Sequence, residues 1–373
     1  MMFKKTLIAS AITTAAVLSS GTVVADNGEG FIDGSSMNMG IMYYGRERDH
    51  DIMGEGIRVH ALGLNANFKS GFFKDWLGID VSAVSNIDLL NGSGHGQSEV
   101  LYWNNTTEKE RSSARFNKAR VKMKFGDESM GARVNAGYTD IYAGTIGTSA
   151  GVNAHSYRGL DAKFTMANLQ LAYGWADQFL PDWDTEYRDM SNKWHRRQEW
   201  DVPNDGGADI DYIHSIGARY SLDQGWVDVA YGEGKGFRTN YHLAGSYSFD
   251  LDTFGKLTFI SYYQSGKYEE GATNLFYKQG GTEREYTWST SMTLDKGNWE
   301  FKTGYGQTKA PDFGEYTLRL TAWANSDHRN FLQTAAQLDD FIHDGQKVVM
   351  FSTSYRFDGR LKGLSAGAGY YYG

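Results

Sequence analysis

Residues Arg115 to Tyr138 read RFNKARVKMKFGDESMGARVNAGY, and this stretch decides the fold. Every second residue forms a nearly continuous apolar row, namely Asn117, Ala119, Val121, Met123 and Phe125. The alternate row begins at Phe116 and continues with four consecutive cations, Lys118, Arg120, Lys122 and Lys124. A period of two places the two rows on opposite faces of a β-strand.

The same pattern restarts after a short turn at 126–131. One row then holds Ala132, Val134, Ala136 and Tyr138, and the other holds Arg133, Asn135 and Gly137. A small soluble core requires bulky interlocking side chains, whereas this apolar face mixes alanine with large residues and ends in aromatics. The mixture favours a lipid-facing wall with an aromatic belt around a polar, cationic lumen. We therefore predict two strands of a transmembrane β-barrel.

The composition of the whole chain agrees with a barrel. Proline cannot donate to a β-ladder, and only 3 of the 373 residues are proline, against 45 glycines and 24 tyrosines. Aromatic residues make up 14% of the chain, which suits two interfacial belts. Mean hydropathy is only -0.52, and a barrel tolerates this polarity because half of each strand faces away from lipid.

Charge and cysteine content exclude several classes of function. The chain has no cysteine, which excludes disulfides, zinc knuckles and thiol chemistry, and we expect no metal and no cofactor. The formal net charge is -8 and becomes -10 without residues 1–25, which carry two lysines and no acid. An acidic chain with its cations confined to particular strands is a poor nucleic-acid binder.

Residues 1–25 read as a secretory signal peptide. Lys4 and Lys5 form the charged start, residues 7–18 the short apolar core, and Val23-Val24-Ala25 the cleavage site. We expect removal of this segment and export of the remainder, residues 26–373, as one barrel domain of a bacterial outer membrane.

Alternating patterns continue along the chain and predict about fifteen strands. They cover residues 37–44, 61–68, 77–85, 116–125, 132–138, 159–164, 169–175, 211–222, 226–231, 241–249, 257–263, 286–294, 299–305, 348–357 and 364–372. Their connections alternate between short turns and long loops, as in outer-membrane barrels with short periplasmic turns and long extracellular loops. Bacterial single-chain barrels have an even number of strands, so we expect this sequence to be incomplete at its C-terminus.

The start of the exported part, GFIDGSSMNMGIMYYGRERDHD, resembles the opening of the OprD-type substrate-specific porins, and within them the chitoporin branch. The resemblance continues through KARVKMKFG, ARVNAGY, DIDYIHSIGARYSL and GQKVVMFSTSYRF, and so spans essentially the whole exported chain. Each of these motifs alone is short.

The resemblance implies an eighteen-stranded antiparallel barrel, narrowed by inward-folded loops and lined by a ladder of basic residues. The matching cations are Lys118, Arg120, Lys122 and Lys124, with Arg133 beside them. The family carries small carboxylates, peptides or, in the chitoporin branch, chitooligosaccharides. The sequence departs from the family by lacking the last strands.

Two long loops are candidates for contact with a solute. Residues 176–209 include aromatic and cationic side chains suited to sugar stacking and hydrogen bonding: Trp183, Tyr187, Trp194, Trp200, Arg196 and Arg197. The alternative is an ordered surface loop held by its own aromatics. Residues 139–156 are small and polar, which fits either a segment folded into the lumen or a flexible loop.

We predict an outer-membrane porin that passes a small hydrophilic solute passively and contacts lipid and lipopolysaccharide. Its oligomeric state, monomer or trimer, stays open. One alternative is an outer-membrane barrel enzyme of the phospholipase or protease type. It is disfavoured because no catalytic constellation stands out, and the adjacent pair His214 and Ser215 must face opposite sides of a strand. A secreted β-rich carbohydrate-binding protein is a further alternative.

Overall fold

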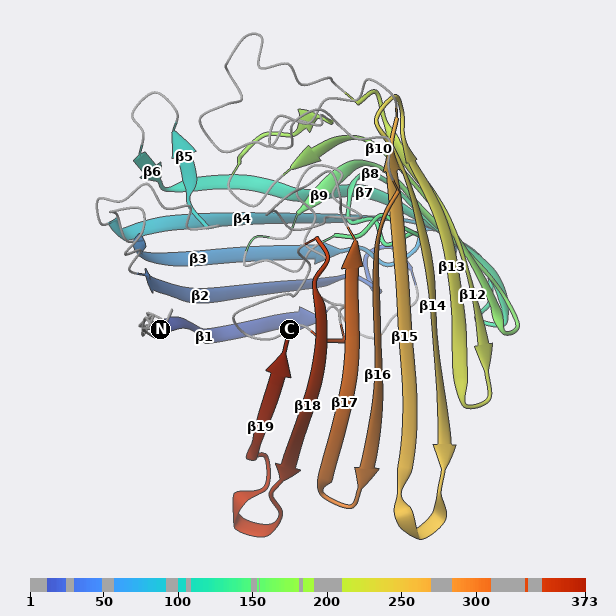
Figure 1. Cartoon of the computed structure of the whole chain (residues 1–373). Coiled ribbons are helices and arrows are strands. Elements are labelled where there is room, and N and C mark those ends of the chain that lie inside the picture. The colour runs from blue at the N-terminus through green and yellow to red at the C-terminus, as the bar shows by residue number, and fades with distance from the viewer. Residues whose placement is uncertain are drawn as a thin grey trace.

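The computed structural model describes residues 12–24, 30–48, 57–91, 100–104, 109–148, 153, 155–180, 184–190, 210–269, 284–309, 333–334 and 344–373. Almost every element in these ranges is a β-strand (Figure 1). No helix in the described part of the chain is both long and apolar enough to cross a membrane.

All fifteen predicted strands are present, and most run longer than the alternating patterns indicated. They are β2 (Ser36–Arg48), β3 (Ile57–Lys69), β4 (Leu77–Asn91), β7 (Ser113–Gly126), β8 (Met130–Thr139), β9 (Ser156–Met166), β10 (Leu169–Leu180), β12 (Ile213–Leu222), β13 (Gly225–Gly234), β14 (Arg238–Asp250), β15 (Lys256–Tyr268), β16 (Glu285–Lys296), β17 (Trp299–Lys309), β18 (Lys347–Arg356) and β19 (Ser365–Tyr372). The sequence patterns did not mark β1 (Ile12–Val24) or the short strands β5 (Tyr102–Asn104), β6 (Lys109–Arg111) and β11 (Arg188–Asp189).

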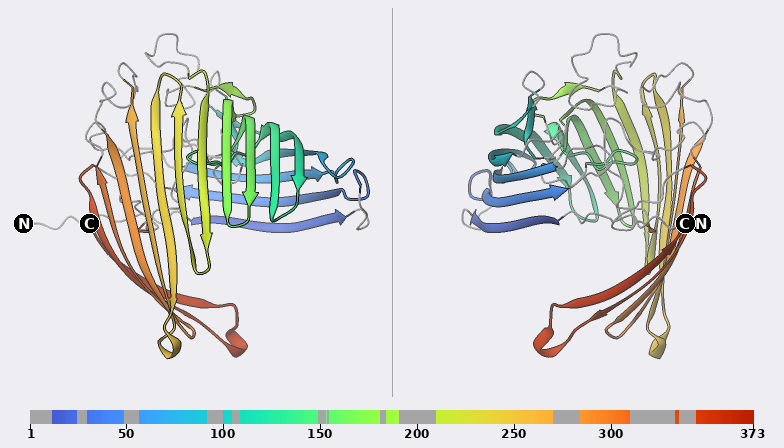
Figure 2. Two further views of the ribbon diagram at one scale, coloured as in Figure 1. Left: turned by 90° about the vertical axis from the view of Figure 1, so that its right-hand side faces the viewer. Right: turned by 60° about the vertical axis from the view of Figure 1, so that its left-hand side comes forward.

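All of these strands except β5 and β6 form one antiparallel sheet, in which each long strand pairs with the next along the chain. Strands β5 and β6 pair only with each other. The sheet curves strongly, so that β1–β4 run nearly across the direction of β15–β19 (Figure 2). Strands β1 and β19 are its two edges, and the sheet is not closed between them. An edge inside a bilayer would leave backbone groups unpaired at a cost of several kcal/mol each, so both edges need a partner in the membrane.

Strand β1 lies within the segment predicted to be a signal peptide. Its backbone pairs antiparallel with β2, with one irregularity between Val17 and Ser19. The prediction that residues 1–25 are removed stays a prediction. Their removal would expose the hydrogen-bonding edge of β2.

Connections between the strands alternate in length as predicted, with one exception, the short connection 235–237 between β13 and β14. Short turns join the hairpins β3–β4, β7–β8, β9–β10, β12–β13, β14–β15, β16–β17 and β18–β19. In the β7–β8 turn the Asp127 carboxylate accepts hydrogen bonds from the Ser129 hydroxyl and from the N–H groups of Ser129 and Met130. These bonds, that of the hydroxyl foremost, lower the pKa of Asp127 below its usual value.

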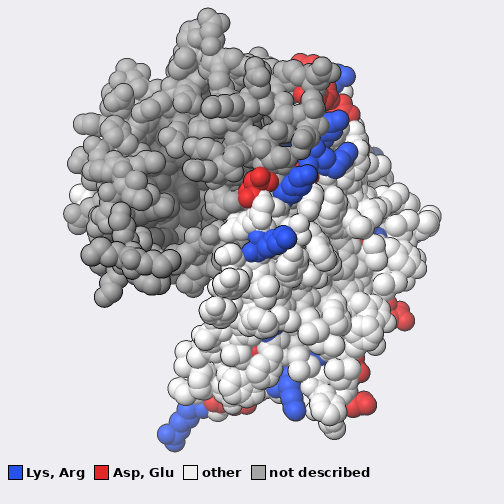
Figure 3. All heavy atoms as spheres, viewed as in Figure 1, with Lys and Arg blue, Asp and Glu red and all other residues white. Residues whose placement is uncertain are grey.

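One face of the sheet is apolar and exposed. Val229, Leu243 and Phe351 lie on three different strands and expose 44%, 51% and 56% of their surface. Large apolar side chains repeat along this outer face from β2 to β18, far beyond the patch that a soluble monomer presents to water. On the part of the surface drawn from β14 to β19, charged side chains gather mainly toward the two ends (Figure 3). This arrangement suits lipid around the middle of the wall and disfavours the secreted, soluble alternative.

A β-bulge corrects the predicted facing of one residue. Between β4 and β7 the register passes from Ser82 opposite Lys118 to Ala83 opposite Phe116, so that Asn117 is an extra residue in β7. The bulge turns Phe116 away from the cations and onto the outer face, where it is 64% exposed. The assignment of Phe116 to the cationic row was therefore wrong, because strict alternation ends where two residues oppose one.

If one face of β14 contacts lipid and the other faces the lumen, an added arginine should destabilise the protein more on the outer face than on the inner face. We expect Leu243→Arg to lower the free energy of unfolding by about 2 to 4 kcal/mol, because it places a cation in lipid. Ser246→Arg, on the inner face of the same strand, is the control and should lose less than about 1 kcal/mol. Denaturant unfolding of the protein in lipid vesicles measures both, and equal losses would contradict the assignment.

Candidate functional site

The connection between β8 and β9 folds back onto the inner face of the sheet. Ile141, Ala143 and Ile146 are at most 2% exposed and pack in one cluster with residues of β9, β10 and β12. Burying an isoleucine side chain contributes about 1.5 to 3 kcal/mol, more than the roughly 1 kcal/mol of a typical hydrogen bond. Apolar packing therefore contributes substantially to holding residues 140–148 on the inner face, in agreement with the inward-folded interpretation of this loop.

Glycines on the wall make room for this segment. A Cβ atom on Gly217 of β12 would lie 2.9 Å from the Cα atom of Gly144, and one on Gly232 of β13 would lie 1.9 Å from Oγ1 of Thr145. Gly144 itself has a positive φ of 59°, which a residue with a side chain rarely adopts. The close approach of loop and wall thus depends on glycine on both sides.

Hydrogen bonds fix the position of the loop on the wall. The Thr145 N–H donates to the Ser215 hydroxyl at 2.8 Å, and that hydroxyl donates to the Tyr231 carbonyl at 2.7 Å. On the other side, the Tyr142 N–H donates to the Asp161 carboxylate at 3.1 Å. Burial, and then the nearby carboxylates of Asp140 and Asp161, raise the pKa of Tyr142, so its phenol stays neutral.

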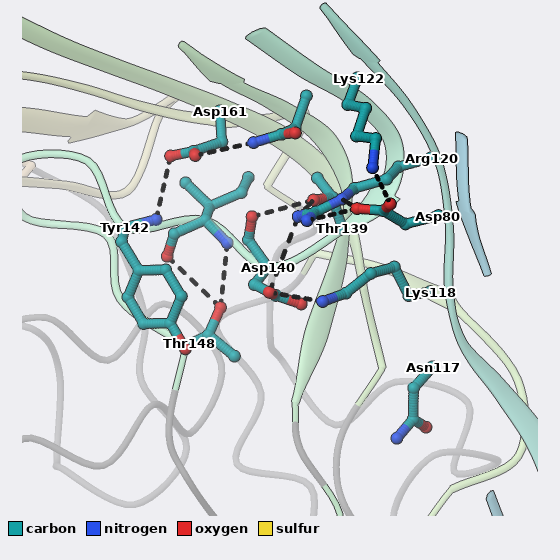
Figure 4. A network of polar contacts seen from close by, with 12 residues as sticks. Asp80, Asn117, Lys118, Arg120, Lys122, Thr139, Asp140, Tyr142, Thr148 and Asp161 are labelled. Atoms are coloured by element: carbon teal, nitrogen blue, oxygen red, sulfur yellow. Dashed lines mark hydrogen bonds and ion pairs between the residues drawn. The ribbon is translucent and has the colours of Figure 1, made fainter. Parts of the chain in front are cut away.

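The predicted basic ladder faces this loop, and three of its cations form ion pairs there with two carboxylates. Figure 4 shows Lys118, Arg120 and Lys122 of β7 directed toward two carboxylates. Asp140 of the loop lies 2.7 Å from Lys118 Nζ and 3.8 Å from Arg120 Nη1. Asp80 of β4 lies 2.7 Å from both Arg120 Nη2 and Lys122 Nζ.

Asp80 is the centre of this charge network. Its side chain is only 4% exposed, and a carboxylate buried to this extent needs both cations to offset the loss of water. Arg120 also donates to the Thr139 hydroxyl at 3.1 Å, next to the start of the loop. Lys118 and Arg120 therefore tie the loop to β7 through Asp140 and Thr139, which the sequence did not indicate.

A second group of inner-face cations has no acidic partner among the residues that the structure describes. Lys124, Arg133 and Lys163 lie directly opposite one another on β7, β8 and β9. Lys124 Nζ lies 4.4 Å from the centre of the Phe72 ring, and Lys163 Nζ lies 5.9 Å from that of Tyr142. Like charges in direct cross-strand contact destabilise a sheet, so this row of three is kept at a cost in stability.

Of the six loop residues predicted to contact a solute, only Tyr187 can be placed. Its hydroxyl donates to the Asn117 carbonyl at 3.0 Å and so accepts from the Ser156 hydroxyl at 2.6 Å. Burial raises its pKa to about 12. These contacts make Tyr187 a tether between its loop and the bulge of β7. The other five lie outside the described residues, namely Trp183, Trp194, Trp200, Arg196 and Arg197, and their role stays a prediction.

Sequence reasoning missed Asp80, Asp140 and Lys163. Two of the three had a usable signal, because Asp80 occupies the inward parity of its strand and Lys163 that of β9. Aligning these parities across neighbouring strands would have placed Asp80 beside the cations. Asp140 stands at the start of an irregular loop, where periodicity gives no direction.

The arrangement suits selection of polar solutes rather than covalent chemistry. Cations and carboxylates alternate within a few ångströms along the inner face, and a segment held by packing faces them. Such a wall offers fixed hydrogen-bond donors and acceptors to a solute that leaves its hydration shell.

Comparison with known proteins supports this interpretation. No family model matches the chain. The chain is 27% identical over 402 residues to the protein named chitoporin from Escherichia coli strain K12, and the match covers 99% of this chain and 80% of that protein. This likeness favours a channel over the alternative of a barrel enzyme.

Solved structures show the same fold at low sequence identity. The crystal structure of Acinetobacter baumannii OccAB1 matches with a TM-score of 0.74 and 15% identity, over 93% of this chain and 82% of that chain. Pseudomonas aeruginosa OccK8 (OprE) matches with a TM-score of 0.70 and 14% identity, over 92% and 84%. These structures confirm the predicted fold class, and together with the chitoporin match they confirm the resemblance to OprD-type porins and the location in the bacterial outer membrane.

The glycines of the wall that contact the inward-folded loop allow a direct test of whether this loop narrows the path. We expect Gly217→Ala to lower single-channel conductance measurably, because the new Cβ atom pushes the loop backbone at Gly144 away from the wall and farther into the lumen. The matched control is Gly245→Ala on β14, where a Cβ atom would meet only the Trp226 carbonyl oxygen, at 3.4 Å. Unchanged conductance in a correctly inserted Gly217→Ala protein would show that the loop does not narrow the path.

Proposed function

We propose that this outer-membrane barrel, which resembles the OprD-type porins, is a substrate-specific channel for chitooligosaccharides. One observation carries the proposal: the inner face brings the ion-paired row of Lys118, Arg120 and Lys122 against the inward-folded loop. A solute that passes there exchanges bonds to water for bonds to fixed donors and acceptors. Chitooligosaccharides carry hydroxyl and amide groups that both donate and accept, and the relative named chitoporin makes them the first choice.

The near balance of positive and negative charge around Lys118, Arg120 and Lys122 favours a neutral solute there. Three cations face the carboxylates of Asp80 and Asp140, so only about one positive charge stays uncompensated among the five groups. Paired charges present strong local dipoles and a weak net field. They orient polar groups without holding an anion tightly.

Small carboxylates are the second candidate, and a separate observation favours them. Lys124, Arg133 and Lys163 form a row of like charges with no acidic partner in the described part of the chain. Such a row creates a positive local potential and attracts anions. The two candidates thus correspond to two different sets of side chains on the same wall.

Planar-bilayer recording of the full chain tests the proposal. We expect discrete conductance steps that chitotriose interrupts at lower concentration than succinate does. Succinate blocking at the lower concentration would replace the first candidate by the second. Correctly inserted protein that gives no conductance would contradict the channel itself.

The double variant Lys124→Met, Arg133→Met separates the two sets of side chains. We expect it to weaken the block by succinate about tenfold, equivalent to about 1.4 kcal/mol, and to leave the block by chitotriose unchanged. The control is Lys118→Met, which removes an anchor of the loop and should raise conductance instead. Equal loss of both blocks in the double variant would contradict separate roles.

A further inference from the structure

A group of aromatic and charged side chains lies on the inner face of β12–β15, on other strands than Lys118, Arg120 and Lys122 of the basic row. The rings of Trp226 and Tyr262 lie 6.0 Å apart at 58°, and Tyr262 lies 6.1 Å from the ring of His242. The guanidinium of Arg219 lies 4.1 Å from the centre of the Trp226 ring. Asp228 completes the group, 3.6 Å from His242 Nε2.

Alternation along the strands places this group on the inner face. Val227 and Val229 flank Asp228 and are exposed on the outer face, as are Leu243 beside His242 and Tyr263 beside Tyr262. The cross-strand register brings the group together. Arg219, Asp228, Ala244 and Tyr262 lie opposite one another, one on each of the four neighbouring strands β12 to β15.

The group lies between the inward-folded loop and the short turns. Trp226 is the second residue of β13, directly after the β12–β13 turn. Gly217, which contacts the loop, pairs with Ala230, two residues farther from that turn than Asp228. A solute that enters from the long-loop end therefore meets this group after the segment 140–148.

Asp228 has unused capacity to accept hydrogen bonds. Its carboxylate makes no hydrogen bond with any residue that the structure describes, and its side chain is 25% exposed. Arg219 of β12 lies directly opposite Asp228, but its guanidinium stacks on Trp226 and forms no ion pair with Asp228. His242 is held by Gln264, whose amide lies 3.2 Å from Nδ1, and its Nε2 is too far from Asp228 for a hydrogen bond.

This combination matches the chemistry of a neutral sugar. Aromatic rings offer flat apolar surfaces with polar edges, against which the C–H face of a sugar packs. A carboxylate accepts hydrogen bonds from two hydroxyl or amide N–H groups at once. The carboxylate of Asp228 repels anions, and the guanidinium of Arg219 repels cations. The two groups together therefore favour an uncharged sugar ring with several hydrogen-bond donors.

We propose that Trp226, Asp228 and Tyr262 form a saccharide-binding site on the channel wall, beyond the inward-folded loop. A sugar ring packs on one of the two aromatic rings while its hydroxyl or amide N–H groups donate to Asp228. The site rests on the proposed passage of chitooligosaccharides. It adds a second place, distinct from the basic row, where the sugar pauses before release.

Single-channel recording with chitotriose as the probe tests the site. We expect Tyr262→Leu and Trp226→Leu each to shorten the time that chitotriose blocks the channel about tenfold, with the block by succinate unchanged. Asp228→Asn keeps the shape of the side chain and should shorten the block by chitotriose several-fold. It also serves as the test if an aromatic variant fails to insert.

The matched control is Tyr263→Leu, which removes the neighbouring aromatic ring from the outer face of the same strand and should leave blocking times unchanged. Wild-type times for chitotriose in Tyr262→Leu, Trp226→Leu and Asp228→Asn would overturn the site and leave the channel intact. If chitotriose fails to block even the wild-type protein, the proposed solute is wrong and the site falls with it.

Discussion

Every backbone N–H and C=O group that enters a bilayer needs a partner within the protein, and the rest of this structure depends on that constraint. A chain with 3 prolines and no spanning helix in its described part meets it by pairing each long strand with the next. Pairing then fixes the two faces. Large apolar residues such as Leu243 and Phe351 turn outward, and the polar residues that remain on the other parity form the inner wall.

The inner wall is organised by close approach and by compensation of charge. Gly217 and Gly232 leave room for a loop whose isoleucines pack against the wall, and Lys118 and Arg120 fasten the start of that loop to β7. The cations of the basic row therefore act first on the protein itself. We propose that a solute is attracted by Lys124, Arg133 and Lys163, which have no acidic partner in the described part of the chain, and by the aromatic group of β13 and β15.

Alternation along the chain predicted the strands and the parity of Lys118 to Lys124, because a period of two is a local property. It failed at Phe116, where an extra residue in β7 is visible only through the register with β4. Alternation within one strand also does not pair Arg120 with Asp80, 40 residues away, because that pairing depends on the register between β4 and β7. The loop position was undecided because small residues permit both an inward and a flexible segment, and only Gly144, Gly217 and Gly232 together show which one fits.

We propose that the cationic face of β7 lines a water-filled path. A chain without cysteine allows a direct measurement, in which a water-soluble, charged thiol reagent is added during single-channel recording of Lys124→Cys and of its neighbour Phe125→Cys. This placement predicts a stepwise fall in conductance for Lys124→Cys and no change for Phe125→Cys. Equal modification of both, or of Phe125→Cys alone, would contradict it.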